Sequence, residues 1–239
     1  MPQPDWDPQR VLGIILARGG SRGIPGKNLR PLAGQPLITR AVDRLQEVPE
    51  VSRVVVSTDD PEIARVAREQ GADVPFLRPA RLAEDDTPSL TALSHAVHLL
   101  VGDQERAALT LLYQATSPCC GVGDLSGAIA ALRSSDAGYL QSVTPVREHP
   151  HWMGRLEGQR LRFLYPAAER VSRRQDLPAL YRLNGAISIY RTERMLQGRA
   201  TEGDPLAYVM EPEASLDLDD LHDWEEAERF LARELHGAP

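Results

Sequence analysis

Short apolar runs alternate along the first 143 residues with stretches in which apolar side chains recur at helical spacing. The first run, Val11-Leu-Gly-Ile-Ile-Leu-Ala17, is apolar at almost every position, which is typical of a strand buried on both faces. In residues 36–48 the apolar side chains fall on one face of a helix: Leu37, Ile38, Ala41, Val42 and Leu45. The pattern therefore predicts a buried strand followed by a helix that packs on it.

The same alternation continues down the chain. We predict further strands at residues 53–57, 74–77, 107–113 and 138–143, and helices at residues 61–70, 91–101 and 122–134. Asp60 and Pro61 are typical of the residues that begin a helix, and Gly71 of the residue that ends one. Near-continuous apolar strands separated by helices indicate an α/β fold with a mostly parallel sheet covered on both faces. Ligands of such sheets bind beyond the carboxyl ends of the strands.

The alternation breaks at Pro145. Residues 145–183 are rich in arginine and irregular, with only weak alternation at residues 160–164. The pattern of the parallel sheet returns with a predicted strand at residues 184–190, and a helix at residues 221–235 closes the chain. We therefore predict one domain over residues 1–239, with a small lobe inserted at residues 145–183.

Composition and charge limit the classes of function that the chain can have. The chain has 239 residues and a formal net charge of -7, which gives no support for nucleic-acid binding, because that function needs a basic surface. No apolar run approaches the ~20 residues of a membrane helix, so no membrane partner is expected. The only cysteines, Cys119 and Cys120, are adjacent and form neither a disulfide framework nor a zinc ribbon. We expect a soluble protein of the reducing cytoplasm.

The loop after the first strand, Leu16-Ala-Arg-Gly-Gly-Ser-Arg-Gly-Ile-Pro-Gly-Lys-Asn28, combines glycines with cations. Such a turn can present backbone N–H groups and positive charge to phosphate oxygens. A Walker A loop requires glycine where Ser21 stands and a hydroxyl where Asn28 stands. The dinucleotide-binding fingerprint fails because Gly19 and Gly20 are adjacent. The ATPase and dehydrogenase interpretations are therefore excluded.

This loop resembles the signature loop of sugar-nucleotide nucleotidyltransferases, in the form used by the acylneuraminate cytidylyltransferases (CMP-sialic acid synthetases and their relatives). Further stretches that are similar to this family follow in order between about residues 12 and 219. They are Arg78-Pro-Ala-Arg-Leu-Ala-Glu-Asp-Asp-Thr-Pro-Ser89, Gln114-Ala-Thr-Ser-Pro-Cys-Cys120, Arg173-Arg-Gln-Asp-Leu-Pro-Ala-Leu-Tyr-Arg182 with Asn184-Gly-Ala-Ile, and Ser215-Leu-Asp-Leu-Asp-Asp220.

The resemblance implies a Rossmann-like nucleotidyltransferase fold, a dimerisation lobe at residues 145–183, and active sites completed across a homodimer. It implies that CTP contacts Leu16, Ala17, Arg18, Gly20, Ser21, Lys27, Asn28, Arg78 and Ser89. It places the sugar acid or the departing pyrophosphate against Gln114, Arg174, Arg182 and Asn184. Without the other motifs, a solvated basic face would be the preferred interpretation of the two arginines. Ser89 could also serve as a cap of the following helix.

Two carboxylates form the candidate metal site. In an extended segment Asp217 and Asp219 project to the same side, and Mg²⁺ (or Mn²⁺) takes one or two protein carboxylates besides phosphates and water. The resemblance implies that both bind the catalytic metal and act in catalysis together with Arg18 and Lys27. As an alternative, Asp219 or Asp220 caps the last helix, although capping does not account for Asp217.

The expected reaction transfers CMP from CTP to the anomeric hydroxyl of a sialic acid or related nonulosonic acid and releases pyrophosphate. Two positions depart from the family. Cys120 stands where the family carries arginine. Trp152 stands near the sequence position at which the sialic-acid enzymes carry lysine. Two alternatives therefore stay open: a related nucleotidyltransferase that uses another triphosphate or sugar, and a nucleotide-binding relative without turnover.

Overall fold

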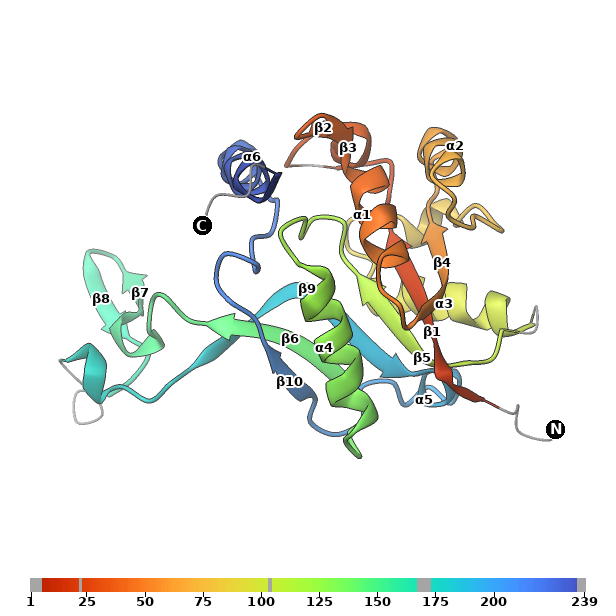
Figure 1. The fold of residues 1–239 in the computed structure, drawn as a ribbon. Helices are drawn as coiled ribbons and strands as arrows, with labels where there is room; N and C mark the ends of the chain where they lie inside the picture. Colours follow the sequence, from red (N-terminus) through yellow and green to blue (C-terminus); the bar gives the residue numbers. More distant parts are fainter. Residues whose placement is uncertain (1–5, 22, 103–104, 167–172, 236–239) are drawn as a thin grey trace.

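The computed structural model describes residues 6–21, 23–102, 105–166 and 173–235, without the side chains of Arg174 and Leu235. Its centre is a six-stranded sheet in the order β10-β6-β9-β5-β1-β4 (Figure 1). The strands are β1 (Asp7–Leu16), β4 (Val51–Ser57), β5 (Ala107–Tyr113), β6 (Tyr139–Pro145), β9 (Tyr181–Arg191) and β10 (Leu206–Val209). The predicted α/β architecture with a mostly parallel sheet is confirmed, since β4, β1 and β5 run parallel, as do β6 and β10.

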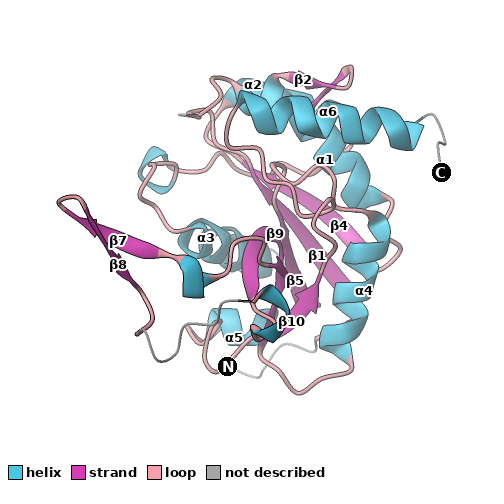
Figure 2. Cartoon of the chain, turned by 90° about the vertical axis from the view of Figure 1, so that its left-hand side faces the viewer, coloured by secondary structure: helices cyan, strands magenta, loops and turns pink. Residues whose placement is uncertain are grey.

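Helices cover both faces of the sheet because β1 is apolar on both. Val11 and Ile15 belong to the core cluster under α1 (Leu37–Gln46), α2 (Pro61–Glu69) and α4 (Val122–Arg133). Leu12 and Ile14 point the other way, into the cluster under α3 (Ser89–Gly102) and α5 (Thr192–Leu196). The last helix, α6 (Leu221–Leu235), lies across the carboxyl ends of the parallel strands (Figure 2). Among the described residues no helix has the length and apolar character needed to cross a membrane.

Two sequence predictions about strands were wrong. Residues 74–77 form no strand, and only an isolated bridge joins Val55 to Asp73 nearby. Pro75 lies within this segment and Pro79 follows it two residues later, and neither can donate a ladder hydrogen bond. The second error concerns β9, which runs antiparallel to both β5 and β6 instead of continuing the parallel pattern. The preceding lobe projects beyond the carboxyl end of β6, so the chain re-enters the sheet from that end and runs in the opposite direction. The short strand β10 was not predicted.

The part of the lobe that the structure describes between β6 and β9 is small and stands away from the sheet (Figures 1 and 2), whereas residues 181–183 already belong to β9. It contains the hairpin β7 (Gly154–Glu157) and β8 (Arg160–Phe163), with the 3-10 turns η3 (Pro150–Trp152) and η5 (Arg174–Asp176) beside it. The weak alternation at residues 160–164 thus corresponds to β8. Four short elements in the first 82 residues complete the fold: η1 (Lys27–Leu29), β2 (Pro31–Leu32), β3 (Gln35–Pro36) and η2 (Ala80–Leu82).

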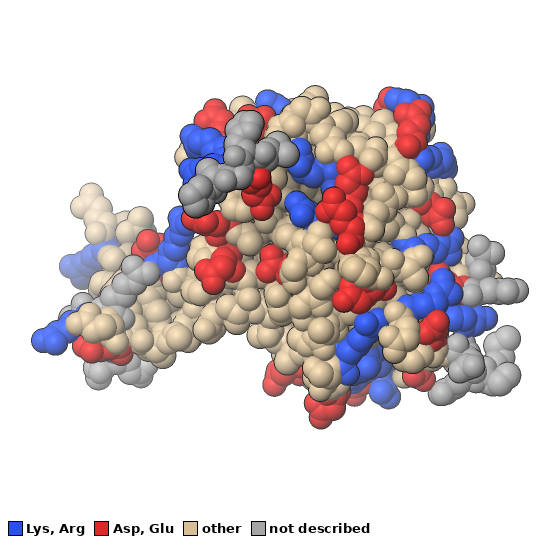
Figure 3. All heavy atoms as spheres, in the orientation of Figure 1, with Lys and Arg blue, Asp and Glu red and all other residues tan. Residues whose placement is uncertain are grey.

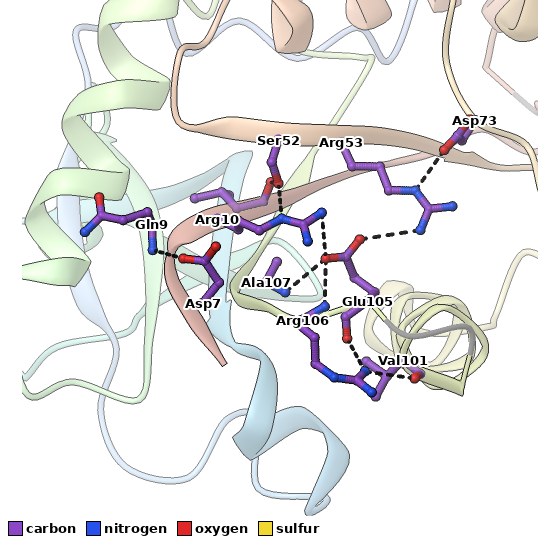
Figure 4. Close-up of polar contacts among 11 residues, drawn as sticks. Asp7, Gln9, Arg10, Ser52, Arg53, Asp73, Val101, Glu105, Arg106 and Ala107 are labelled. Carbon is purple, nitrogen blue, oxygen red and sulfur yellow. Dashed lines mark hydrogen bonds and ion pairs between the residues drawn. The ribbon is translucent and has the colours of Figure 1, made fainter. Parts of the chain in front are cut away.

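A buried carboxylate joins strands at the amino end of the parallel sheet (Figure 4). Glu105 is only 3% exposed and accepts hydrogen bonds from the backbone N–H groups of Arg106 and Ala107, at 2.9 and 3.0 Å. It also pairs with Arg10 of β1 and Arg53 of β4, each at 3.4 Å. These donors offset the cost of burying its charge. The network therefore stabilises the end of the sheet opposite to the predicted ligand site.

Candidate active site

A hollow of about 500 Å³ opens at the carboxyl ends of β1 and β5. It is bordered by the glycine-rich loop after β1, by the segment that leads into α3, and by the turn after β5. Many of the predicted ligand residues meet here, although they are far apart in the sequence: Leu16, Arg18, Ser21, Lys27, Asn28, Arg78, Ser89, Gln114 and Asp219. Ala17 is instead fully buried, and Gly20 is exposed and does not line the hollow.

The glycine-rich loop is held from two sides. The buried side chain of Asn28 donates a hydrogen bond from Nδ2 to the backbone oxygen of Arg18 at 2.9 Å, across the base of the loop. The backbone N–H of Gly19 donates to Oδ1 of Asp59, in the turn after β4, at 3.1 Å. These two hydrogen bonds hold the start of the loop at Arg18 and Gly19, which favours a preorganised anion site.

Glycine is needed at Gly23 because another segment of the chain approaches it closely. A Cβ atom there would lie 2.1 Å from the backbone oxygen of Asp219, which no real contact allows. The sequence motif contains this glycine but gives no hint of the segment that it admits. Gly23 and Asp219 are thus brought side by side.

Both predicted phosphate cations have partners within the protein. Arg18 Nη1 lies 2.6 Å from Oδ1 of Asp85, on the segment before α3. Lys27 Nζ donates to the backbone oxygen of Leu218 at 2.6 Å, between the two predicted metal ligands. Lys27 therefore ties the glycine-rich loop directly to the acidic segment, 191 residues away in the sequence.

Arg78 is the most unusual cation of the hollow. It is only 5% exposed, and its Nε and Nη2 have no hydrogen-bond partner among the described residues. Nη2 lies 3.7 Å from Oδ1 of Asp59, beyond hydrogen-bond distance. Burial lowers the pKa of the Arg78 guanidinium, Arg18 lowers it further, and Asp59 raises it. Buried polar groups are normally satisfied, so these donors are suited to bind an anionic or carbonyl group of a ligand.

A second hollow of about 1110 Å³ lies beside the first, and Asp219 lines both. Its walls are the end of β6, the start of β9, residues 212–219 and one side of α6. Figure 3 shows acidic side chains gathered beneath α6, on the side from which the lobe projects. The segment that carries Asp217 and Asp219 thus lies between the two hollows, an arrangement that suits a reaction between two substrates.

The acidic segment contains a carboxyl with a shifted pKa, Asp217, and a separate residue that caps α6. Burial raises the pKa of the Asp217 carboxyl, and the charge of Asp219 raises it further, whereas a hydrogen bond from Thr116 and the charge of Lys27 lower it. The helix cap is a different residue, because Asp220 Oδ1 accepts the backbone N–H groups at 222 and 223, at 2.8 and 3.0 Å. Capping therefore does not use the side chains of Asp217 and Asp219.

The predicted sugar-binding residues are not gathered in one place. Gln114 lines the first hollow and Arg182 the second, while the side chain of Arg174 lies outside the described part of the structure. Asn184 is only 3% exposed: its Nδ2 donates to Ser215 Oγ at 2.8 Å, and its Oδ1 accepts from the Ser142 hydroxyl. The geometry gives Asn184 the role of holding the 215–219 segment on the sheet.

Sequence reasoning missed the contribution of α6. Its side chains at positions 222, 223, 226, 229, 230 and 233 line the second hollow, as does Thr144 of β6. Thr144 is buried, and its Oγ1 has no partner among the described residues. The spacing of these positions is visible in the sequence, but only the packing of α6 shows which of its faces borders a cavity.

The sheet, the cationic glycine-rich loop and the carboxylate pair that Lys27 joins to it are those of a nucleotidyltransferase. A family model described as cytidylyltransferase matches residues 12–230, and the chain belongs to this family. It is 35% identical over 225 residues to N-acylneuraminate cytidylyltransferase B of Danio rerio, covering 92% of this chain and 51% of that protein. The chain therefore spans about half the length of that relative.

A second relative matches over nearly its whole length. CMP-N,N'-diacetyllegionaminic acid synthase of Legionella pneumophila is 29% identical over 227 residues, covering 93% of this chain and 96% of the relative. Among solved structures, CMP:2-keto-3-deoxy-manno-octonic acid synthetase complexed with CTP has a TM-score of 0.68 at 18% identity, covering 94% of this chain and 99% of that chain. At that identity the likeness supports the fold, and the expected nucleotidyltransferase fold is confirmed.

Proposed function

We propose that the chain transfers CMP from CTP to the anomeric hydroxyl of a sialic acid or related nonulosonic acid and releases pyrophosphate. One observation carries the proposal: Asp219 borders both hollows, and Lys27 joins its segment to the glycine-rich loop. A triphosphate in the first hollow would therefore present its α-phosphorus to an acceptor in the second. The names of the relatives from Danio rerio and Legionella pneumophila support this substrate class.

In the proposed complex the triphosphate lies on the glycine-rich loop. Arg18, Ser21 and Lys27 neutralise its charge and donate hydrogen bonds, while Leu16 and Asn28 fix the walls of the site. Arg18 exchanges the carboxylate of Asp85 for a phosphate oxygen. Base and ribose occupy the side of the hollow formed by Arg78 and Ser89, where the unpartnered guanidinium nitrogens find carbonyl acceptors.

The carboxylate pair fits a divalent cation, which we propose to be Mg²⁺ or Mn²⁺. No group of three or more metal-ligating side chains occurs in the described ranges, and Mg²⁺ commonly takes one or two carboxylates. The mutual repulsion of Asp217 and Asp219 is the property that a cation would relieve. When bound, the ion would screen phosphate charge and lower the pKa of a ligated hydroxyl. Thr116 orients Asp217 by a hydrogen bond.

The acceptor occupies the second hollow in this proposal. The transfer needs positioning and charge stabilisation, and it asks little covalent chemistry of the protein. Gln114, at the end of β5, is placed to bond a hydroxyl where the two substrates meet. Arg182 and Arg174 provide guanidinium groups for the sugar carboxylate or the departing pyrophosphate, and Asn184 positions the acidic segment from behind.

We also propose that the lobe at residues 145–183 forms a homodimer. Its hairpin presents large apolar side chains to solvent, with Leu156 exposed by 76% and Leu161, Phe163 and Leu164 also exposed. Exposed apolar surface of this kind marks an interaction site. A reducing cytoplasmic setting is consistent with Cys119 and Cys120, which are buried and unpaired.

Pyrophosphate release tests the function directly. We expect release with CTP and a nonulosonic acid, and not with ATP, GTP or UTP. Asp219→Asn should abolish the release, whereas Asp204→Asn, an exposed aspartate outside both hollows, should not change it. Binding of CTP without pyrophosphate release across a broad panel of sugar acids would contradict the proposal and favour a nucleotide-binding relative without turnover.

A further inference from the structure

The helix α6 has two functional faces. One face packs into the core of the domain through Trp224, Ala227 and Leu231, which are all buried. An adjacent face borders the second hollow, where the helix crosses the carboxyl ends of the strands (Figure 2). Because the packed face fixes the rotation of the helix, the side chains of the adjacent face have a defined position along the hollow.

Charge changes sign along this face. Its first turns carry Asp223 and Glu226, and its last turns carry Arg229 and Arg233. The acidic end is tied to the reaction centre, because Asp223 Oδ2 accepts the backbone N–H of Asp219 at 2.9 Å. With a rise of 1.5 Å per residue, the backbone of the first arginine lies about 9 Å beyond Asp223 and that of the second about 15 Å beyond it.

The two arginines have no protein partner within the part of the chain that the structure describes. Neither guanidinium takes part in a hydrogen bond or an ion pair there, although Glu226 precedes Arg229 by one turn of the helix. Arg65 of α2 shows the contrast, since it pairs with Glu62 and Glu69. Like charges one turn apart are unfavourable without a counterpart. Phe230 lies between the two arginines and lines the same hollow.

We infer that α6 determines which acceptor is used: Arg229 and Arg233 bind acylamido oxygens at the end of the sugar acid that is distant from the reacting hydroxyl. This inference rests on the proposed function. In a 2-keto sugar acid the anomeric carbon bears both the hydroxyl and the carboxylate, so both groups must lie at the Asp219 end. Groups near the arginines therefore belong to the far side of the ring and to its exocyclic chain.

The chemistry of this wall favours acylamido groups over free hydroxyls. A guanidinium donates hydrogen bonds and accepts none, so it satisfies a carbonyl oxygen better than a hydroxyl that also needs an acceptor. Phe230 offers apolar surface to the methyl group of an acyl substituent. The acidic first turns of the same face remain beside the reaction centre, where the hydroxyl is activated.

The test compares two nonulosonic acids that differ only in carrying an acetamido group or a hydroxyl at a distal carbon. With the acetamido compound, Arg229→Gln and Arg233→Gln should each raise the acceptor KM about tenfold, the loss of one charge-assisted hydrogen bond. The KM for CTP and the kcat should stay unchanged, and the hydroxyl compound should be affected little. Arg229→Lys, which keeps the charge and loses the planar fork, should fall between. Arg65→Gln is the matched control.

The outcomes separate this inference from the proposed function. If the wild-type protein releases no pyrophosphate with any nonulosonic acid, both are overturned. If it turns over but the variants lose activity equally with both acceptors, or lose none, only the role of α6 is overturned. A raised KM for CTP would equally contradict it. A thermal midpoint equal to that of Arg65→Gln shows that a variant is folded.

Discussion

Replacing Arg78 by methionine should make the free protein more stable and the CTP complex weaker. The two unpartnered nitrogens of its buried guanidinium each cost about 1 kcal/mol or more in the folded state. The pair with Asp59 at 3.7 Å offsets about 0–1 kcal/mol of this, because that carboxylate is partly exposed. Methionine fills a similar space without polar atoms. The net gain on replacement is about 1–2 kcal/mol, which for a domain of this size raises the thermal midpoint by about 2–8 °C.

The same substitution removes donors that the ligand is proposed to satisfy. CTP affinity, measured by calorimetry, should fall at least about tenfold. Arg65→Met, at an exposed position, is the control and should change neither quantity by more than about 0.5 kcal/mol. A lower thermal midpoint for Arg78→Met would refute the reasoning about the cost of burial. Unchanged CTP affinity would refute the assignment of Arg78 to the nucleotide.

Three further predictions concern other groups. In metal-free protein the pKa of Asp217 is raised, so ionisation of this carboxyl lowers the free energy of unfolding. The loss of stability is absent at a pH below the pKa of the unfolded chain and is complete once the pH exceeds the pKa of the folded protein. Asp217→Asn should raise the thermal midpoint at neutral pH and not in acid. Burial raises the pKa of Cys119 to about 12 and that of Cys120 still further. Both thiols should therefore resist thiol reagents in the native protein and react with the same reagents at once after unfolding. Glu105→Ala should cost about 2 kcal/mol in urea unfolding, because it leaves two backbone donors unpaired, while the KM for CTP stays constant.

The fold was largely predictable where a strand is buried on both faces and short helices follow it. The strand at residues 11–17 and the helix at residues 61–70 needed only local signals, namely an apolar run and an N-cap before a proline. The direction of β9 was not predictable in this way. Its residues are apolar in either orientation, and the direction depends on where the lobe returns the chain to the sheet.

The same limit applies to the candidate site. The residue types of the loop at Leu16–Asn28 were enough to indicate phosphate binding, and the resemblance supplied the positions of Arg78 and Asp219. The sequence did not distinguish Asn184, which is turned into the core, from Gln114, which lines a hollow. Asn184 lies within β9 and Gln114 directly follows β5, and only their neighbours decide which amide is accessible.

By itself the sequence determined most of the strands of the sheet, the chemistry of the glycine-rich loop and the presence of two carboxylates near the end of the chain, because each depends on residues close together. The tertiary structure decided that Lys27 meets Leu218, that Asp219 borders two hollows, and that α6 faces the second of them. These contacts join segments almost 200 residues apart. Local pattern carries no information about them, because they arise only when the core packs and fixes the rotation of each helix and the path of each loop.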